Sequence, residues 1–287
     1  MSKAARRIIA AAKKILRYAH YSKVKTPVFV LGCQRSGTTL VLNVAGRSPK
    51  VHSYHEGDGV ILDVEYFRII SEDAVRKAID KTPEPIILFK PLNDSQYVDR
   101  LLGMHENAKA IWLYRHYRDV VDSAIKLWGD AQRTIMHEVS KGVYTDPGSR
   151  AVGEQVTPEN LEMVKRFTAK GLSPGDGAAL LWYLRNSIYF DLGLQTNPRV
   201  LLCKYEDLVR ESGKRFEAIF KFIGAGYSPK YTADVHASSV KKESAVAFDH
   251  EIVRLCEGMV KRLDDARLSQ SVPQPSGGTR TNAPSFS

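Results

Sequence analysis

The feature that most constrains the fold is a glycine-bounded loop between an apolar run and a helix-forming run near the start of the chain. Residues 27–31 are apolar and rich in β-branched and aromatic side chains, which is typical of a central strand of a parallel sheet. Residues 32–37 form the loop, and residues 38–42 continue with helical spacing. Such a loop directs backbone N–H groups and the positive end of a helix dipole at one place. The stretch therefore predicts an α/β fold with an anion-binding site.

The loop has the spacing of a phosphate-binding P-loop with one substitution. In the pattern Gly-x-x-x-x-Gly-Lys-Ser/Thr the lysine reaches the β- and γ-phosphates, and Thr38 stands at that position here. Arg35, two residues before Gly37, supplies a cation that can offer a planar, bidentate fork to a terminal oxyanion. The loop therefore predicts a phosphate ligand, but not ATP.

The motif Gly-x-x-Arg-Ser-Gly-Thr-Thr after a strand resembles the 5'-phosphosulfate loop of sulfotransferases, which take a sulfuryl group from 3'-phosphoadenosine-5'-phosphosulfate (PAPS). The resemblance implies a P-loop-type three-layer α/β fold, in which helices flank a central parallel sheet. It also implies that the 5'-phosphosulfate is held by Arg35, Ser36, Gly37, Thr38 and Thr39. Arg35 would act in catalysis as well.

A second motif surrounds another expected strand. Residues 110–114 are apolar and end at Arg115, and Asp119 is the expected N-cap of the helix that follows. Arg115 and Ser123 are eight residues apart, so both can reach one phosphate. This pair resembles the 3'-phosphate motif of sulfotransferases. A kinase that binds ATP or GTP has no use for this second anion site.

A polar, glycine-flanked turn follows a possible strand at residue 51. In open α/β sheets ligands lie at the carboxyl ends of strands, so the turn is expected to face Arg35. Transfer to an alcohol needs a base, and the resemblance implies Glu56 in that role. His55 and Asp58 are the alternatives, and a simple surface turn stays open.

Two more strand ends carry candidate residues. Lys90 follows the apolar run 86–89, and Pro91 marks where regular pairing ends. The ammonium group of Lys90 can neutralise charge on the bridging oxygen as the sulfuryl group departs. Tyr205 is the first residue of the motif Tyr-Glu-Asp-Leu, which comes after the apolar run 200–203. The resemblance implies that this tyrosine lies near the adenine of the donor.

The positive charge is concentrated at the amino terminus. The chain has 42 basic and 32 acidic residues, and residues 1–25 hold eight of the basic and none of the acidic ones. The remainder is almost neutral, which argues against nucleic-acid binding. Apolar residues in the arm recur at helical spacing, so we expect an amphipathic helix. Three alternatives stay open for this helix: it contacts an anionic membrane surface, docks on the body or stays solvated. Residues 26–268 are expected to form the sulfotransferase domain and residues 269–287 a disordered tail.

Three cysteines without a CxxC pair predict neither a disulfide framework nor a zinc site, and Cys33 is interpreted as loop filler. No metal is expected, because cationic side chains already take that role. The chain lacks an apolar run near ~20 residues and a signal core, which predicts a cytoplasmic protein; association with the inner face of the membrane stays open. Residues 129–175 are interpreted as loops around short helices, which form either an acceptor-binding lid or packing specific to the fold. The helix expected over 178–192 has Arg185 among its polar members.

These patterns predict an enzyme that transfers a sulfuryl group from PAPS to a hydroxyl or amine acceptor. The expected acceptor is a small molecule, a carbohydrate or a lipid-linked glycan. Two alternatives stay open: a P-loop small-molecule kinase, and a non-catalytic nucleotide-binding module.

Overall fold

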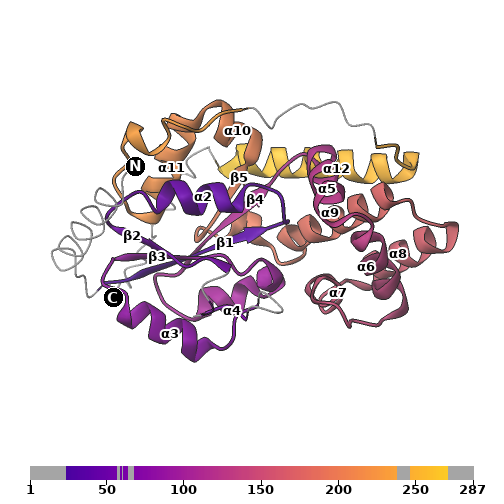
Figure 1. Cartoon of the computed structure of the whole chain (residues 1–287), viewed down its shortest axis with the longest axis horizontal. Helices are drawn as coiled ribbons and strands as arrows, with labels where there is room; N and C mark the ends of the chain where they lie inside the picture. Colours follow the sequence, from indigo (N-terminus) through magenta and orange to yellow (C-terminus); the bar gives the residue numbers. More distant parts are fainter. Residues whose placement is uncertain (1–23, 57–58, 60, 64–67, 238–245, 271–287) are drawn as a thin grey trace, which may run out of the picture.

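A single parallel sheet forms the centre of the molecule. The computed structural model describes residues 24–56, 59, 61–63, 68–237 and 246–270. The sheet has five strands in the order β2-β3-β1-β4-β5, and every pair is parallel. Helices cover both faces of this sheet (Figure 1). The predicted three-layer α/β fold is confirmed.

The strands are short apolar runs, as expected of strands covered on both faces. They are β1 (Thr26–Gly32), β2 (Val51–Ser53), β3 (Ile86–Phe89), β4 (Lys109–Tyr114) and β5 (Val200–Lys204). All residues of β3 are buried, and in β1 and β4 only the first residue is partly exposed. The apolar runs recognised in the sequence are therefore strands of one sheet.

Alternation along the strands divides the core between the two faces of the sheet. On one face, Val28 and Val30 of β1 belong to a buried cluster with Val41 of α2 (Thr38–Ala45) and Phe216 of α11 (Ser212–Ile223). On the other face, Phe29 and Leu31 belong to a larger cluster that also contains residues of α9 (Pro174–Asp191) and α12 (His250–Gln270). This packing fixes β1, and with it the loop that follows.

The other helical elements occur between the strands and after β5. They are α3 (Glu72–Lys81), η2 (Leu92–Tyr97), α4 (Val98–Gly103), α5 (Tyr117–Trp128), α6 (Ala131–Lys141), α7 (Pro147–Gly153), α8 (Pro158–Lys170), η3 (Leu194–Thr196), α10 (Tyr205–Arg210) and η4 (Pro229–Tyr231). Among the described residues, none of the helices combines the length and apolar content needed to cross a bilayer.

The excursion 129–175 is more helical than the sequence predicted. Helix α8 has 13 residues, and the Thr157 side chain accepts a hydrogen bond from the backbone N–H of Asn160 at its start. Helix α9 likewise begins with Ser173 as N-cap and a proline in its first turn. An N-cap residue followed by proline is a helix-start signal. The prolines of residues 129–175 therefore mark the starts of helices, whereas they were interpreted from the sequence as loop residues.

Two further boundaries differ from the sequence predictions. Helix α5 begins at Tyr117 with His116 as N-cap, so Asp119 is not the cap but lies in the first turn, where the helix dipole favours a carboxylate. Helix α12 runs through Gln270, whose side chain donates to the Tyr189 hydroxyl at 3.1 Å, so Ser269 and Gln270 are helical. The rest of the expected tail and residues 1–23 of the expected arm lie outside the described residues.

Candidate functional site

A cavity of about 890 Å³ lies at the carboxyl ends of the strands. Its size falls within the roughly 300–1,000 Å³ of ligand pockets. Its lining includes nine of the side chains singled out in the sequence: Arg35, Gly37, Thr38, Thr39, Glu56, Lys90, Arg115, Ser123 and Tyr205. Ser36 is completely buried and lies outside the lining. The fold thus gathers candidates from the ends of all five strands at one cavity.

The loop between β1 and α2 has a backbone suited to an anion. Gly37, the N-cap of α2, has φ of 91°, and the helix start has no side-chain cap. A Cβ atom on Gly37 would lie 2.3 Å from Cδ2 of Tyr205, so a larger residue would force the ring away. Arg35 has φ of 67°, which is uncommon for a residue other than glycine. This strained turn keeps the uncapped helix start open towards the cavity.

Arg35 joins the loop to helix α5. Its Nε donates to the Ser123 hydroxyl at 2.9 Å, and its guanidinium carbon lies 6.0 Å from the centroid of the Trp128 ring. The residues predicted for the 5'-phosphosulfate and those predicted for the 3'-phosphate therefore adjoin directly.

Arg115 lies at the end of β4 and is 9% exposed. One of its terminal nitrogens is 3.2 Å from a carboxylate oxygen of Asp119, and its guanidinium lies 4.5 Å from the centroid of the Tyr205 ring. Tyr205 is thus placed between Gly37 and Arg115. The structure brings Arg115, Ser123 and Tyr205 to the same cavity, although the Ser123 hydroxyl contacts Arg35 while Arg115 contacts Asp119.

Lys90 connects the remaining candidates. Its Nζ is 2.9 Å from the hydroxyl oxygen of Thr39 and 2.9 Å from a carboxylate oxygen of Glu56. Glu56 is the described candidate base that lines the large cavity. His55 lines a separate, smaller hollow, and Asp58 lies outside the described residues.

A family model described as the sulfotransferase domain matches residues 25–250, a range that contains every site residue above. The chain belongs to the sulfotransferase domain family. Sulfuryl transfer is the reaction of that family, and the recognition made from the sequence is confirmed. The match covers the sheet, the cavity and the excursion between β4 and β5.

Solved structures of similar fold are also sulfotransferases. One is the sulfotransferase domain from the curacin biosynthetic pathway, with a TM-score of 0.51, 15% identity, and coverage of 83% of this chain and 99% of that chain. Another is a sulfotransferase from Alicyclobacillus acidocaldarius, with a TM-score of 0.49, 14% identity, and coverage of 86% and 96%. At 15% identity the likeness to the curacin domain is one of fold alone. The sequence matches none of the curated proteins with which it was compared.

Cys33 of this sulfotransferase lies in the P-loop and is buried. Burial raises the pKa of its thiol to about 12, so the thiol is protonated at neutral pH and is a poor nucleophile. This agrees with its interpretation as loop filler. Within the described ranges no group of three or more His, Cys, Asp or Glu side chains is arranged to hold a metal ion.

Arg185 of α9 is a site residue that sequence reasoning treated only as a polar member of its helix. Its side chain is completely buried yet lines the cavity, and its guanidinium donates to the carbonyl oxygens of Gly32 (3.2 Å), Ala151 (2.9 Å) and Leu92. Burial lowers the pKa of Arg185. The available signal was the apolar character of α9 around the whole helix, because a charge on such a helix must lie inside the protein.

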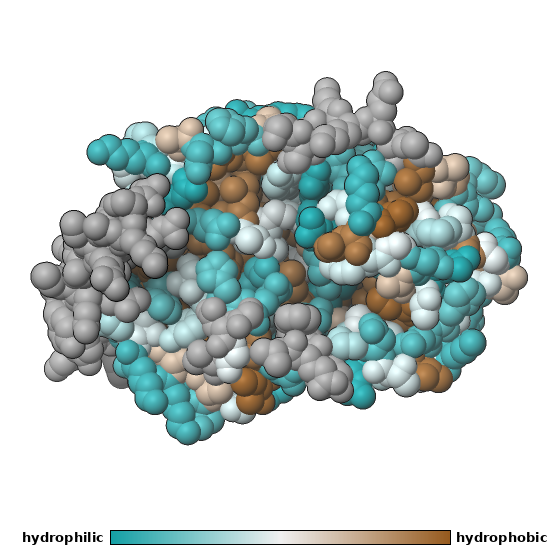
Figure 2. All heavy atoms as spheres, viewed as in Figure 1, coloured by the Kyte–Doolittle hydropathy of each residue, from teal (hydrophilic) through white to brown (hydrophobic). Residues whose placement is uncertain are grey.

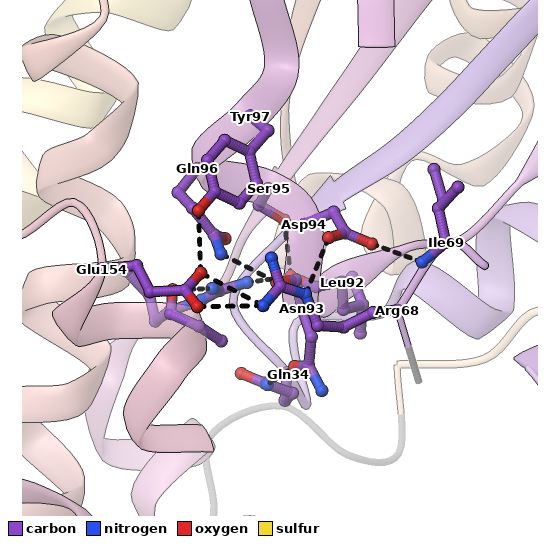
Figure 3. A network of polar contacts seen from close by, with 12 residues as sticks. Gln34, Arg68, Ile69, Leu92, Asn93, Asp94, Ser95, Gln96, Tyr97 and Glu154 are labelled. Carbon is purple, nitrogen blue, oxygen red and sulfur yellow. Dashed lines mark hydrogen bonds and ion pairs between the residues drawn. The ribbon is translucent and has the colours of Figure 1, made fainter. Parts of the chain in front are cut away.

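A polar network on η2 lies beside Gln34 of the P-loop (Figure 3). The Asp94 carboxylate accepts from Arg68 Nε at 3.0 Å and from the Ile69 N–H at 2.7 Å, and Arg68 also pairs with Glu154 at 3.1 Å. Burial raises the pKa of Asp94, while these two donors oppose the rise.

The same element also holds the P-loop. The Gly32 N–H donates to the Ser95 hydroxyl at 3.2 Å, and Gln34 Nε2 donates to Asn93 Oδ1 at 3.0 Å. Element η2 therefore anchors the P-loop. In the sequence, η2 follows Lys90 and Pro91 directly.

Proposed function

We propose that this sulfotransferase moves a sulfuryl group from PAPS to a hydroxyl or amine acceptor in the large cavity. The observation that carries the proposal is the 2.9 Å contact between Arg35 and Ser123, because a single donor could then contact the P-loop and helix α5 together. A site for ATP would not need the second motif. The acceptor proposed from the sequence is a small molecule, a carbohydrate or a lipid-linked glycan.

The residues present fit the proposed donor. The uncapped start of α2 leaves a cradle for the 5'-phosphosulfate, with Arg35 as its cation, and the glycine at position 37 lets the Tyr205 ring lie against the loop. Arg115 would hold the 3'-phosphate by exchanging its contact with Asp119 for the ligand. The Tyr205 ring lies beside both groups, where it offers an apolar face to the adenine.

The proposed chemistry needs one base and one charge-stabilising group. The acceptor oxygen attacks sulfur, the bond from sulfur to the 5'-phosphate oxygen breaks, and adenosine 3',5'-bisphosphate leaves. Glu56 accepts the proton of the acceptor hydroxyl. Lys90 stabilises the negative charge that develops on the departing oxygen, and its contact with Thr39 keeps its ammonium group at the P-loop.

The proposed cellular setting is the cytoplasm. The basic arm, residues 1–25, would contact the anionic surface on the inner face of the membrane. This contact would bring the cavity near lipid-associated acceptors.

Calorimetric titration with adenosine 3',5'-bisphosphate, AMP and ATP tests the donor assignment. We expect the bisphosphate to bind most tightly, and we expect Arg115→Ala to weaken bisphosphate binding at least about tenfold more than AMP binding, because it removes a charged hydrogen-bond partner of the 3'-phosphate. Equal losses for the two ligands would contradict the role of Arg115. Tighter binding of ATP would favour a kinase, and bisphosphate binding without sulfuryl transfer to any acceptor would favour a non-catalytic module.

A further inference from the structure

Arg115, the residue proposed to hold the 3'-phosphate, already has an anionic partner within the protein. One of its terminal nitrogens lies 3.2 Å from a carboxylate oxygen of Asp119, and the side chains of both residues are 11% exposed. We infer that Asp119 competes with the 3'-phosphate for Arg115, which weakens binding of the bisphosphate product and speeds its release. This inference rests on the proposed function and goes beyond it, because it assigns a role to a carboxylate.

The backbone that carries Arg115 is held in place from two sides. The carbonyl oxygen of Arg115 accepts a hydrogen bond from Trp182 Nε1 at 2.9 Å, and the N–H of His116 donates to Glu206 Oε1 at 2.9 Å. Trp182 is completely buried and Glu206 is 5% exposed. Arg115 can therefore exchange one anionic partner for another by rotation of its side chain, without movement of β4 or α5.

The contact with Tyr205 is compatible with such an exchange. The guanidinium carbon of Arg115 lies 4.5 Å from the centroid of the Tyr205 ring, and a cation is attracted to the face of an aromatic ring. The hydrogen bonds of a guanidinium group lie in its own plane, so the ring does not block them. A phosphate held by both terminal nitrogens would need the nitrogen that now contacts Asp119.

Helix α5 changes in character along its length. Its charged residues in the cavity lining are Asp119, Asp122 and Lys126, and it ends in the exposed apolar residues Leu127 and Trp128. Figure 2 shows hydrophilic and hydrophobic side chains side by side over this helix. Asp119 lies in the first turn, beside Arg115, whereas Lys126 follows about two turns later. The α5 charge that a phosphate on Arg115 meets first is therefore negative.

Asp119 opposes the phosphate in two ways. It pairs with Arg115 in the free protein, so that the ligand must displace it, and it repels the phosphate once that group is bound. A phosphate monoester carries a charge of about −1.5 to −2 at neutral pH, and the repulsion is larger in a partly buried site than in water. Arg115 and the start of α5 still attract the phosphate, so Asp119 limits the affinity and does not abolish it.

The consequence concerns turnover. The donor and the product carry the same 3'-phosphate, so a very tight grip on this group would also retain the product. As the product leaves, the Asp119 carboxylate becomes the partner of Arg115 again, which compensates for the lost contact. Changes of affinity at one site appear mostly in the dissociation rate. We therefore expect the competition to shorten the lifetime of the product complex.

Titration of Asp119→Asn with adenosine 3',5'-bisphosphate and AMP tests the inference. The amide keeps the size of the side chain and removes its charge. We expect the bisphosphate to bind at least about threefold more tightly and to dissociate more slowly, and AMP, which lacks the 3'-phosphate, to stay within about twofold of the wild type. Calorimetry measures the affinities, and stopped-flow tryptophan fluorescence measures dissociation.

Asp119→Glu keeps the charge and should stay close to the wild type. Unchanged or weaker bisphosphate binding by Asp119→Asn would overturn the inference; weaker binding would show that Asp119 orients Arg115 for the phosphate. Equal tightening of the bisphosphate and of AMP would overturn it as well, since the effect would not lie at the 3'-phosphate.

A double variant shows whether the effect passes through Arg115. In the Arg115→Ala background we expect Asp119→Asn to tighten bisphosphate binding less than it does in the wild type, because no arginine is released. Equal tightening in the two backgrounds would overturn the competition for Arg115.

Glu159→Gln is the matched control for the helix. Glu159 is the acidic residue in the first turn of α8, and it lies outside the cavity lining. A carboxylate at a helix start stabilises the helix, so both Glu159→Gln and Asp119→Asn should unfold at a slightly lower temperature. Only Asp119→Asn should change the bisphosphate affinity. The same change of affinity in the control would overturn the inference.

The wild-type titration separates the inference from the proposed function. If the wild type binds the bisphosphate more tightly than AMP but Asp119→Asn binds it no more tightly, only the competition is overturned. If the wild type does not prefer the bisphosphate, the proposed 3'-phosphate site is overturned, and the competition with it.

Discussion

Glu56 and Lys90 are held together as an ion pair at 2.9 Å, so the proposed base and the proposed charge-stabilising group form one unit. The side chain of Glu56 is 30% exposed on the cavity side, whereas that of Lys90 is 9% exposed. The carboxylate can therefore meet an acceptor hydroxyl while the ammonium group stays fixed beside Thr39.

Replacing the carboxylate separates catalysis from binding. We expect Glu56→Gln to leave bisphosphate affinity within about twofold and to reduce the rate of transfer at least about tenfold, because the amide cannot accept the proton. The measurement is kcat with a small-molecule hydroxyl acceptor, alongside the dissociation constant of the bisphosphate. His55→Gln is the matched control and should retain activity; a larger loss in the control would assign the base to His55.

Arg185 presents a different question at the residue scale, because it places a guanidinium group inside the protein. Its hydrogen bonds join the start of the P-loop at Gly32, η2 at Leu92 and α7 at Ala151. These partners are neutral carbonyl groups, and in the described residues its Nε has no partner. A buried cation with neutral hydrogen-bond partners costs free energy; the Asp94 carboxylate offsets part of that cost, and a bound anion would offset more. We therefore propose that Arg185 positions the loop and adds positive potential behind it.

We expect Arg185→Met to weaken bisphosphate binding at least about tenfold, because it removes both the charge and the anchor of Gly32. Arg185→Lys keeps the charge but not the planar fork, so its loss should be smaller. Titration at two salt concentrations measures the electrostatic part, and thermal unfolding monitors folding. If both variants lose stability equally while the affinity of the folded protein is unchanged, Arg185 is only structural.

At the scale of elements, the strands and their loops were predictable because their signals are local. The buried strands read as apolar runs, and the loop motif follows β1 directly. The helical content of residues 129–175 was underestimated, since the prolines and glycines were interpreted as loop residues. In the structure Pro147, Pro158 and Pro174 each start a helix. Local sequence patterns therefore predict the strands of the sheet better than the helices of residues 129–175.

The contacts between elements were not predictable in the same way. Arg35 meets Ser123 across 88 residues, and Arg68 meets Asp94 across 26. Such contacts depend on how helices pack over the sheet, and no spacing in the sequence encodes that. The η2 network in Figure 3 was missed for this reason. Motifs identified most of the proposed donor-binding residues that line the cavity, but the partners of these residues came only from the structure.

At the scale of the whole molecule, the charge is distributed unevenly between the arm and the body. The chain has a net charge of +10, and residues 1–23 hold seven basic residues and no acidic one. The chain is anchored to the body just after this segment, at Lys25. Lys25 is 7% exposed and its Nζ donates to the carbonyl oxygens of Thr82 (2.7 Å), Pro83 (3.1 Å) and Glu84 (3.3 Å). Removing residues 1–23 therefore leaves this anchor and β1 in place.

That division allows the proposed membrane contact to be tested without disturbing the site. We expect the full chain to sediment with vesicles that contain phosphatidylserine, and a chain truncated before Val24 to stay in solution, because each lysine or arginine near an anionic surface contributes about 1 kcal/mol. Binding should fall as salt is raised and should be absent with neutral phosphatidylcholine vesicles. Bisphosphate affinity should be equal in the two proteins. If both proteins sediment alike, or neither does, the arm does not bind the membrane; a weaker bisphosphate affinity after truncation would show instead that it docks on the body.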